Sequence, residues 1–132
     1  MTQKNIDVMD IIVSKMKEGA KLSKALKLVY NKRNVAIPYN ENISSVAITS
    51  LPMSNRTINM VMRGRLRTVG DVVEFCEKEK ITKVSGLGKS SCTELFETIL
   101  DYCWDHMSQK ERVSFLIDTV ERNSENIREE FA

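Results

Sequence analysis

Residues 84–104 read VSGLGKSSCTELFETILDYCW and contain the clearest helix signal in the chain. Apolar residues recur at helical spacing from Cys92 to Trp104, which predicts a helix with one buried face. Two glycines precede this helix and allow the backbone to turn sharply. Leu87 between them can point inward and fix the turn. The stretch therefore predicts a tight hairpin at Val84–Ser91 that leads directly into a helix.

Helical periodicity marks several other segments as well. Apolar stripes predict helices at residues 6–18 and 22–33, a helix from the N-cap Ser54 to about Arg63, and a helix at 69–77 that Thr68 and Asp71 cap. They also predict a short helical turn at 78–83 and a last helix that begins at a capping box of Ser108 and Glu111. Gly64 fits the C-terminal end of the helix that Ser54 caps. The chain has only 5 Gly and 2 Pro, which favours helices over a many-stranded fold. We therefore predict an all-α, compact helical bundle of about seven short helices.

The segments between and beyond these helices have turn-forming or polar composition. Residues 34–50 contain Pro38 and several Asn and Ser residues, so we expect an irregular connection there. The run Val46–Ile48 is too short to assign, and we expect the tail after Asn123 to fray. The predicted organisation is an N-terminal helical hairpin at 1–40, a central domain at 41–105, and a C-terminal helix with an acidic tail at 106–132.

The charge of the chain is unevenly distributed, although its formal net value is only +2. Lys15–Arg33 contains seven Lys or Arg residues against Glu18, and Asn55–Gly70 contains four Arg residues and no acid. Asp118–Ala132 reverses this balance, with five acids against two Arg residues. A basic body with an acidic tail is typical of a phosphate-facing surface beside a solvated end.

We expect a cytoplasmic protein. No apolar run approaches the length of a membrane span, and the N-terminus lacks the apolar core of a signal peptide. Cys76, Cys92 and Cys103 are odd in number and lie within apolar patterns, which indicates free buried thiols. Cys103 and His106 also invite a zinc interpretation, but no C-x2-C partner exists, so we predict no metal and no cofactor.

The turn before the clearest helix has the composition of an anion site. Gly88 allows close approach of a ligand, and the N–H groups at the start of the following helix attract anions. Lys89, Ser90 and Ser91 add donors, so a nucleic-acid phosphate is a natural occupant. The G-x-x-x-x-G-K-[ST] spacing of a nucleotide P-loop is absent. A tight interhelical turn without any ligand is the alternative.

A second candidate element is the helix start at Ser54. Arg56 and Asn59 are three residues apart and share one helix face. An arginine can enter the narrow, electronegative minor groove of DNA, and an asparagine can bond base edges or sugars there. For this pair alone, a solvated helix face is the competing interpretation.

The two elements together resemble the C-terminal domain of the bacterial RNA polymerase α subunit. The matching stretches are LPMSNRTINMVMRGRLRTVGDVV and KVSGLGKSSCTELFETIL, between Leu51 and Tyr102. The resemblance implies a helix-hairpin-helix fold for the central domain, docked across the minor groove of A·T-rich double-stranded DNA. It implies DNA-binding roles for Arg56, Asn59, Gly88, Lys89, Ser91 and Glu94. In that family the residue at the position of Glu94 lies beside the DNA surface, where it orients the arginine or meets a partner protein.

The chain also departs from this family. Ser90 stands where the family usually has a second basic residue, and Gly86 where it often has Asn, so one phosphate contact is weaker or missing. The chain of 132 residues has no room for the assembly domain of an α subunit, so we expect a free-standing relative.

Two functions follow from these patterns. The first is a DNA-binding accessory or regulatory protein of transcription. The second is a protein-interaction module that binds RNA polymerase or a transcription factor without binding DNA. The basic segment at 22–33 has two interpretations. Its lysines form a solvated face, or they bind DNA, an acidic protein or a membrane surface. The sequence contains no catalytic set, so we do not expect an enzyme, and it indicates no oligomeric state.

Overall fold

The computed structural model describes residues 1–84 and 86–132, so Ser85 of the predicted hairpin Val84–Ser91 lies outside the described residues. The described chain forms seven α-helices and no β-strand, which confirms the predicted helical class. The α-helices are α1 (Gln3–Lys17), α2 (Leu22–Val29), α3 (Glu41–Ser44), α4 (Asn55–Arg63), α5 (Val69–Lys78), α6 (Lys89–Asp105) and α7 (Gln109–Arg122). Four 3-10 helices complete the structure, namely η1 (Ile48–Ser50), η2 (Ile81–Lys83), η3 (Ser124–Asn126) and η4 (Glu129–Phe131).

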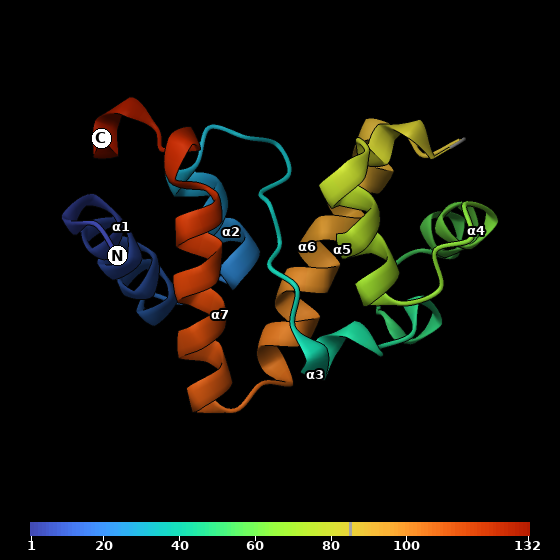
Figure 1. Cartoon of the computed structure of the whole chain (residues 1–132), viewed down its shortest axis with the longest axis horizontal. Helices are drawn as coiled ribbons and strands as arrows, with labels where there is room; N and C mark the ends of the chain where they lie inside the picture. Colours follow the sequence, from blue (N-terminus) through green and yellow to red (C-terminus); the bar gives the residue numbers. More distant parts are fainter. Residues whose placement is uncertain (85) are drawn as a thin grey trace.

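Helix α6 runs through the middle of the molecule (Figure 1). Helices α1 and α4 lie at opposite ends of the molecule's longest axis. Helix α2 packs against α6, and α1 packs against both α2 and α7. The buried apolar side chains of the predicted segments 1–40, 41–105 and 106–132 belong to one hydrophobic cluster, with Ile12, Leu95 and Phe115 as examples. The three segments therefore share a core.

The predicted helix caps are present. Ser54 caps α4, and capping boxes of Thr68 with Asp71 and of Ser108 with Glu111 open α5 and α7. Gly64 ends α4 as expected, but with a negative φ. A Cβ atom at Gly64 would lie 2.7 Å from Cγ1 of Val84, so close packing excludes a side chain there.

Helix α2 ends at Val29, before the predicted end at Arg33, so this predicted boundary was wrong. The backbone becomes extended at Tyr30, which forms an antiparallel bridge with Ile127. The N–H of Asn31 also donates to the carbonyl oxygen of Asn126 at 2.7 Å. Pairing with the C-terminal segment thus replaces the last helical turn.

The same pairing contradicts the prediction that the tail after Asn123 frays. The N–H of Arg128 donates to the carbonyl oxygen of Val29 at 2.8 Å, and Phe131 packs on the hydrophobic cluster. The acidic composition of the tail suggested a solvated end, but its backbone pairs with Val29, Tyr30 and Asn31, at the end of α2 and just after it.

The connection at 34–50 is less irregular than predicted. The side chain of Asn40 accepts a hydrogen bond from the N–H of Asn42 and caps the short helix α3. Val46–Ile48 pairs with the chain ahead of α5, because the N–H of Ile48 donates to Arg67 and the N–H of Val69 donates to Val46, both at 2.9 Å.

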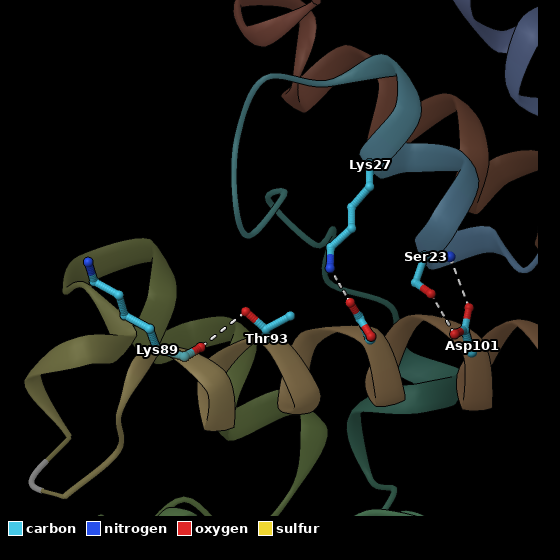
Figure 2. Close-up of polar contacts among 6 residues, drawn as sticks. Ser23, Lys27, Lys89, Thr93 and Asp101 are labelled. Carbon is cyan, nitrogen blue, oxygen red and sulfur yellow. Dashed lines mark hydrogen bonds and ion pairs between the residues drawn. The ribbon is translucent and has the colours of Figure 1, made fainter.

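Polar contacts join α2 to α6 (Figure 2). Asp101 accepts from the backbone N–H of Ser23 at 2.9 Å and from its hydroxyl at 2.6 Å. Because the N-cap residue of α2, Lys21, makes no side-chain cap, Asp101 supplies that acceptor from another helix. Lys27 pairs with Glu97 nearby.

The helices and the cysteines bear on two further predictions. None of the described helices combines the length and apolar character needed to cross a membrane. All three cysteines are free; Cys92 and Cys103 are buried, whereas Cys76 is partly exposed.

The buried amide of Asn123 provides a test of the core. It accepts from the N–H of Ala36 at 2.8 Å and donates to the carbonyl oxygens of Ala36 and Thr119. Asn123→Ala removes the side-chain partner of both the N–H and the carbonyl oxygen of Ala36, whereas Thr119 keeps its bond from the backbone N–H of residue 123. We therefore expect the variant to lower the free energy of unfolding by about 2–3 kcal/mol in chemical denaturation. Asn31→Ala at an exposed position is the control, and an equal loss in both variants would contradict this role.

Candidate nucleic-acid interface

The first turn of α4 is held against α6 by Glu94. Its carboxylate accepts hydrogen bonds from the hydroxyl of Ser54 at 2.7 Å, from the N–H of Ser54 at 3.2 Å, and from the hydroxyl of Thr57. Arg56 lies between these two residues in the sequence and is exposed. The Glu94 contacts therefore set where the backbone of Arg56 lies relative to α6.

These hydrogen bonds also favour the ionised form of Glu94. The hydroxyl of Thr57, followed by that of Ser54, holds the pKa of the Glu94 carboxyl below its ordinary value. The carboxylate is also close to the N-terminus of α4, where a helix favours negative charge. The folded structure therefore favours the ionised form of Glu94, which anchors the first turn of α4 to α6. In the described structure Glu94 forms no ion pair with Arg56.

The rest of α4 lies along the turn before α6. A Cβ atom at Gly86 would be 2.8 Å from the sulfur of Met60, and Gly86 has a φ of +82° that favours glycine. Gly64, at the end of α4, meets Val84 just before the turn. Helix α4 is therefore in contact with α6 at its start and with the turn along its second half.

The start of α6 is an exposed helix N-terminus without a side-chain cap. The N-cap residue of α6 is the exposed Gly88, which has no side chain that could accept a hydrogen bond. The N–H groups of the first turn therefore receive no side-chain cap from this residue. Leu87 is buried and anchors the turn, as its position between two glycines predicts. Lys89 is exposed at the start of α6, and in Figure 2 its side chain extends away from Ser23 and Asp101.

The surface around these elements is basic. Arg56 and Lys89 are exposed, as are three further arginines of α4 and the segment that follows it, namely Arg63, Arg65 and Arg67. In the part of the chain that the structure describes, no ion pair involves any of these five cations. The nearby carboxylates are occupied elsewhere, Glu94 on α4 and Asp71 in its capping box. These five cations therefore have no described carboxylate partner.

The structure places the predicted DNA-binding residues on two contacting elements. Arg56 and Asn59 are exposed on α4, Gly88 and Lys89 are exposed at the start of α6, and Ser91 and Glu94 follow there at partly buried positions. Sequence reasoning did not identify Thr57 as a partner of Glu94. Thr57 lies three residues after the N-cap Ser54 and is buried in the structure. Its hydrogen-bond partner Glu94 is 37 residues away, so no neighbouring residue in the sequence indicates the contact.

The cysteine and histidine that suggested zinc are arranged differently. Cys103 is buried on α6, and burial raises the pKa of its thiol to about 12. Nδ1 of the exposed His106 lies 2.7 Å from the carbonyl oxygen of Tyr102. No described group of three metal-binding side chains includes these residues.

Comparison with known proteins finds no family model, no curated protein and no solved structure that matches the chain.

The Glu94 anchor predicts a specific acid sensitivity. Because its pKa is lowered in the folded protein, its stabilising contribution is present above the pKa of the unfolded chain and is lost as pH falls through the lowered folded value. The difference in unfolding free energy between the native protein and Glu94→Gln should therefore be constant above the ordinary glutamate pKa of about 4.3 and shrink as the pH falls below it. Denaturant titrations at several pH values measure it. Asp105→Asn is the control at an exposed carboxylate of α6, and a difference for Glu94→Gln that stays constant with pH would contradict the anchor.

Proposed function

We propose that this protein is a DNA-binding accessory or regulatory protein of transcription that acts in the cytoplasm. Its target is the backbone and minor groove of A·T-rich double-stranded DNA. The α5–η2–α6 segment would be the helix-hairpin-helix, and α4 would carry the groove-reading side chains. In this proposal the protein binds and does not catalyse.

Arg56 would be the principal minor-groove residue. An A·T-rich minor groove is narrow and strongly electronegative, so an exposed guanidinium with no described carboxylate partner gains most there. Asn59, one helical turn later on α4, would bond base edges or sugars beside it.

The start of α6 would bind the DNA backbone. Gly88 leaves open space around the helix N-terminus, because a Cβ atom placed on it would meet nothing within 4 Å, so a phosphate oxygen can approach the backbone N–H groups. Lys89 and the hydroxyl of Ser91 would add charge and a donor. Arg63, Arg65 and Arg67 would strengthen the field along the same helix and its exit.

The observation that carries this proposal is the Glu94 anchor. It fastens the first turn of α4 to α6 through Ser54 and Thr57, so that two sequence-distant elements form one unit. Because the two elements are already fixed relative to each other, binding would require less ordering of side chains and backbone and would cost less conformational entropy.

A second candidate is a protein-interaction module that binds RNA polymerase or a transcription factor. Ser90 favours this function, since it is exposed at a position where the resemblance leads us to expect a phosphate-binding cation. A pull-down that recovers polymerase or a regulator, with no shift of any duplex, would select it over DNA binding.

Arg56→Ala tests the DNA-binding proposal directly. We expect micromolar or weaker binding of the native protein, with preference for A·T-rich over G·C-rich duplex, and a loss of about tenfold in the variant. Fluorescence anisotropy at several salt concentrations measures this. Lys4→Ala removes a charge from α1, at the opposite end of the molecule (Figure 1), and should have little effect. Unchanged binding by Arg56→Ala would contradict the proposal.

Ser90→Lys is a gain-of-function test. A cation in the first turn of α6 should add one phosphate contact, so the slope of log affinity against log salt should steepen by about one unit. The same anisotropy titrations detect the change. A substitution to Lys at the exposed Ser14 of α1 is the control, and equal steepening in both variants would show general charge attraction instead of a contact at α6.

A further inference from the structure

A broad groove lies apart from α4, between the segment 32–37 and helix α5. It has a volume of about 990 Å³, and residues of η2 and Arg122 of α7 also line it. Figure 1 shows the segment that leads from α2 to α3 on one side of α5 and α4 on the other. The floor of the groove is apolar. It is formed by the partly exposed Ala36 and Cys76 over the buried side chains of Val35, Ile37, Val72, Val73, Ile81 and Phe96.

The rim of the groove is positively charged. Its cationic residues are Lys32, Arg33, Lys78, Lys80, Lys83 and Arg122, and its acidic residues are Glu77 and Glu79. Six cations against two acids give the groove a charge of +4, which exceeds the net +2 of the whole chain.

Both acids of the rim already have cationic partners. Glu79 lies 2.8 Å from Lys83, and Glu77 lies 3.8 Å from Arg122. Among the described residues, Lys32, Arg33, Lys78 and Lys80 have no carboxylate within ion-pair distance, and all four are exposed. The unpaired charge is therefore concentrated on the cations that border the apolar floor.

From this combination we infer that the groove binds a partner protein through a short acidic peptide segment with apolar anchor residues. Asp or Glu side chains of the segment would pair with the unpaired rim cations, and its Leu or Phe side chains would rest on the floor. A nucleic acid fits less well. Its phosphates could meet the rim, but an aliphatic floor offers no hydrogen bonds and little aromatic surface for base stacking.

This inference does not depend on DNA binding. The groove is formed by α5, η2 and the segment 32–37, whereas the proposed DNA contacts come from α4 and the start of α6. If both functions hold, the protein connects DNA to an acidic partner through two different surfaces, and loss of one leaves the other intact.

Selection from a phage-displayed library of short random peptides on the full-length chain tests the inference. We expect enrichment of peptides that combine Asp or Glu with large apolar residues. Their binding to the double variant Lys32→Glu, Lys80→Glu should be weaker by about tenfold or more, because both positions then repel the peptide. Lys4→Glu with Lys110→Glu is the matched double charge reversal at exposed positions of α1 and α7 and should retain binding.

Two further measurements keep the outcome decisive. Circular dichroism and thermal unfolding show whether the groove variant is folded, and NMR spectra show whether the selected peptide shifts the methyl signals of Val72, Val73 and Ile81. Failure to enrich any peptide, enrichment without acidic residues, or equal binding by both double variants would overturn the inference. It would also be overturned if a DNA or RNA oligonucleotide, and not the peptides, shifted those methyl signals.

Discussion

Carboxylates on α6 hold the N-terminal ends of two other helices, and the arrangement of the molecule depends on them. Glu94 accepts hydrogen bonds from Ser54 and Thr57 at the start of α4, and Asp101 accepts from the backbone and hydroxyl of Ser23 at the start of α2. The two acids are seven residues apart, close to two full helical turns, so they project from nearly the same face of α6. Each carboxylate accepts hydrogen bonds from donors at a helix N-terminus that have no partner within that helix. Its negative charge also interacts favourably with the dipole of the same helix.

This constraint also explains how a chain with little net charge can present a strongly basic surface. Asp71, Glu94 and Glu111 are used in caps, so these carboxylates neutralise backbone N–H groups instead of neighbouring arginines. The cations on α4 and around the groove beside α5 are left without described partners. Positive charge therefore accumulates on two separate faces, and the apolar floor of the groove distinguishes its proposed peptide ligand from the DNA proposed for α4.

Local signals predicted the features that depend on near neighbours in the sequence. The helical period of α6, the capping boxes of α5 and α7, and the burial of Leu87 all follow from residues a few positions apart. The features that were missed depend on distant partners. Asn123 bonds the backbone of Ala36 across 87 residues, and pairing with the tail ends α2 at Val29. Arg56 and Asn59 could be selected as candidates by resemblance, but the Glu94 anchor that positions their helix spans 40 residues and has no local signature.

We expect Glu94 to position Arg56 for the proposed contact with DNA, and a double-mutant cycle on DNA affinity measures this coupling. Binding of an A·T-rich duplex is measured for the native protein, Arg56→Ala, Glu94→Ala and the double variant, all under conditions where each is folded. If Glu94 acts by holding the first turn of α4, the two losses are strongly non-additive, and Arg56→Ala has little further effect once Glu94 is gone. Losses that simply add would contradict the claim, because Arg56 would then reach DNA equally well without the anchor.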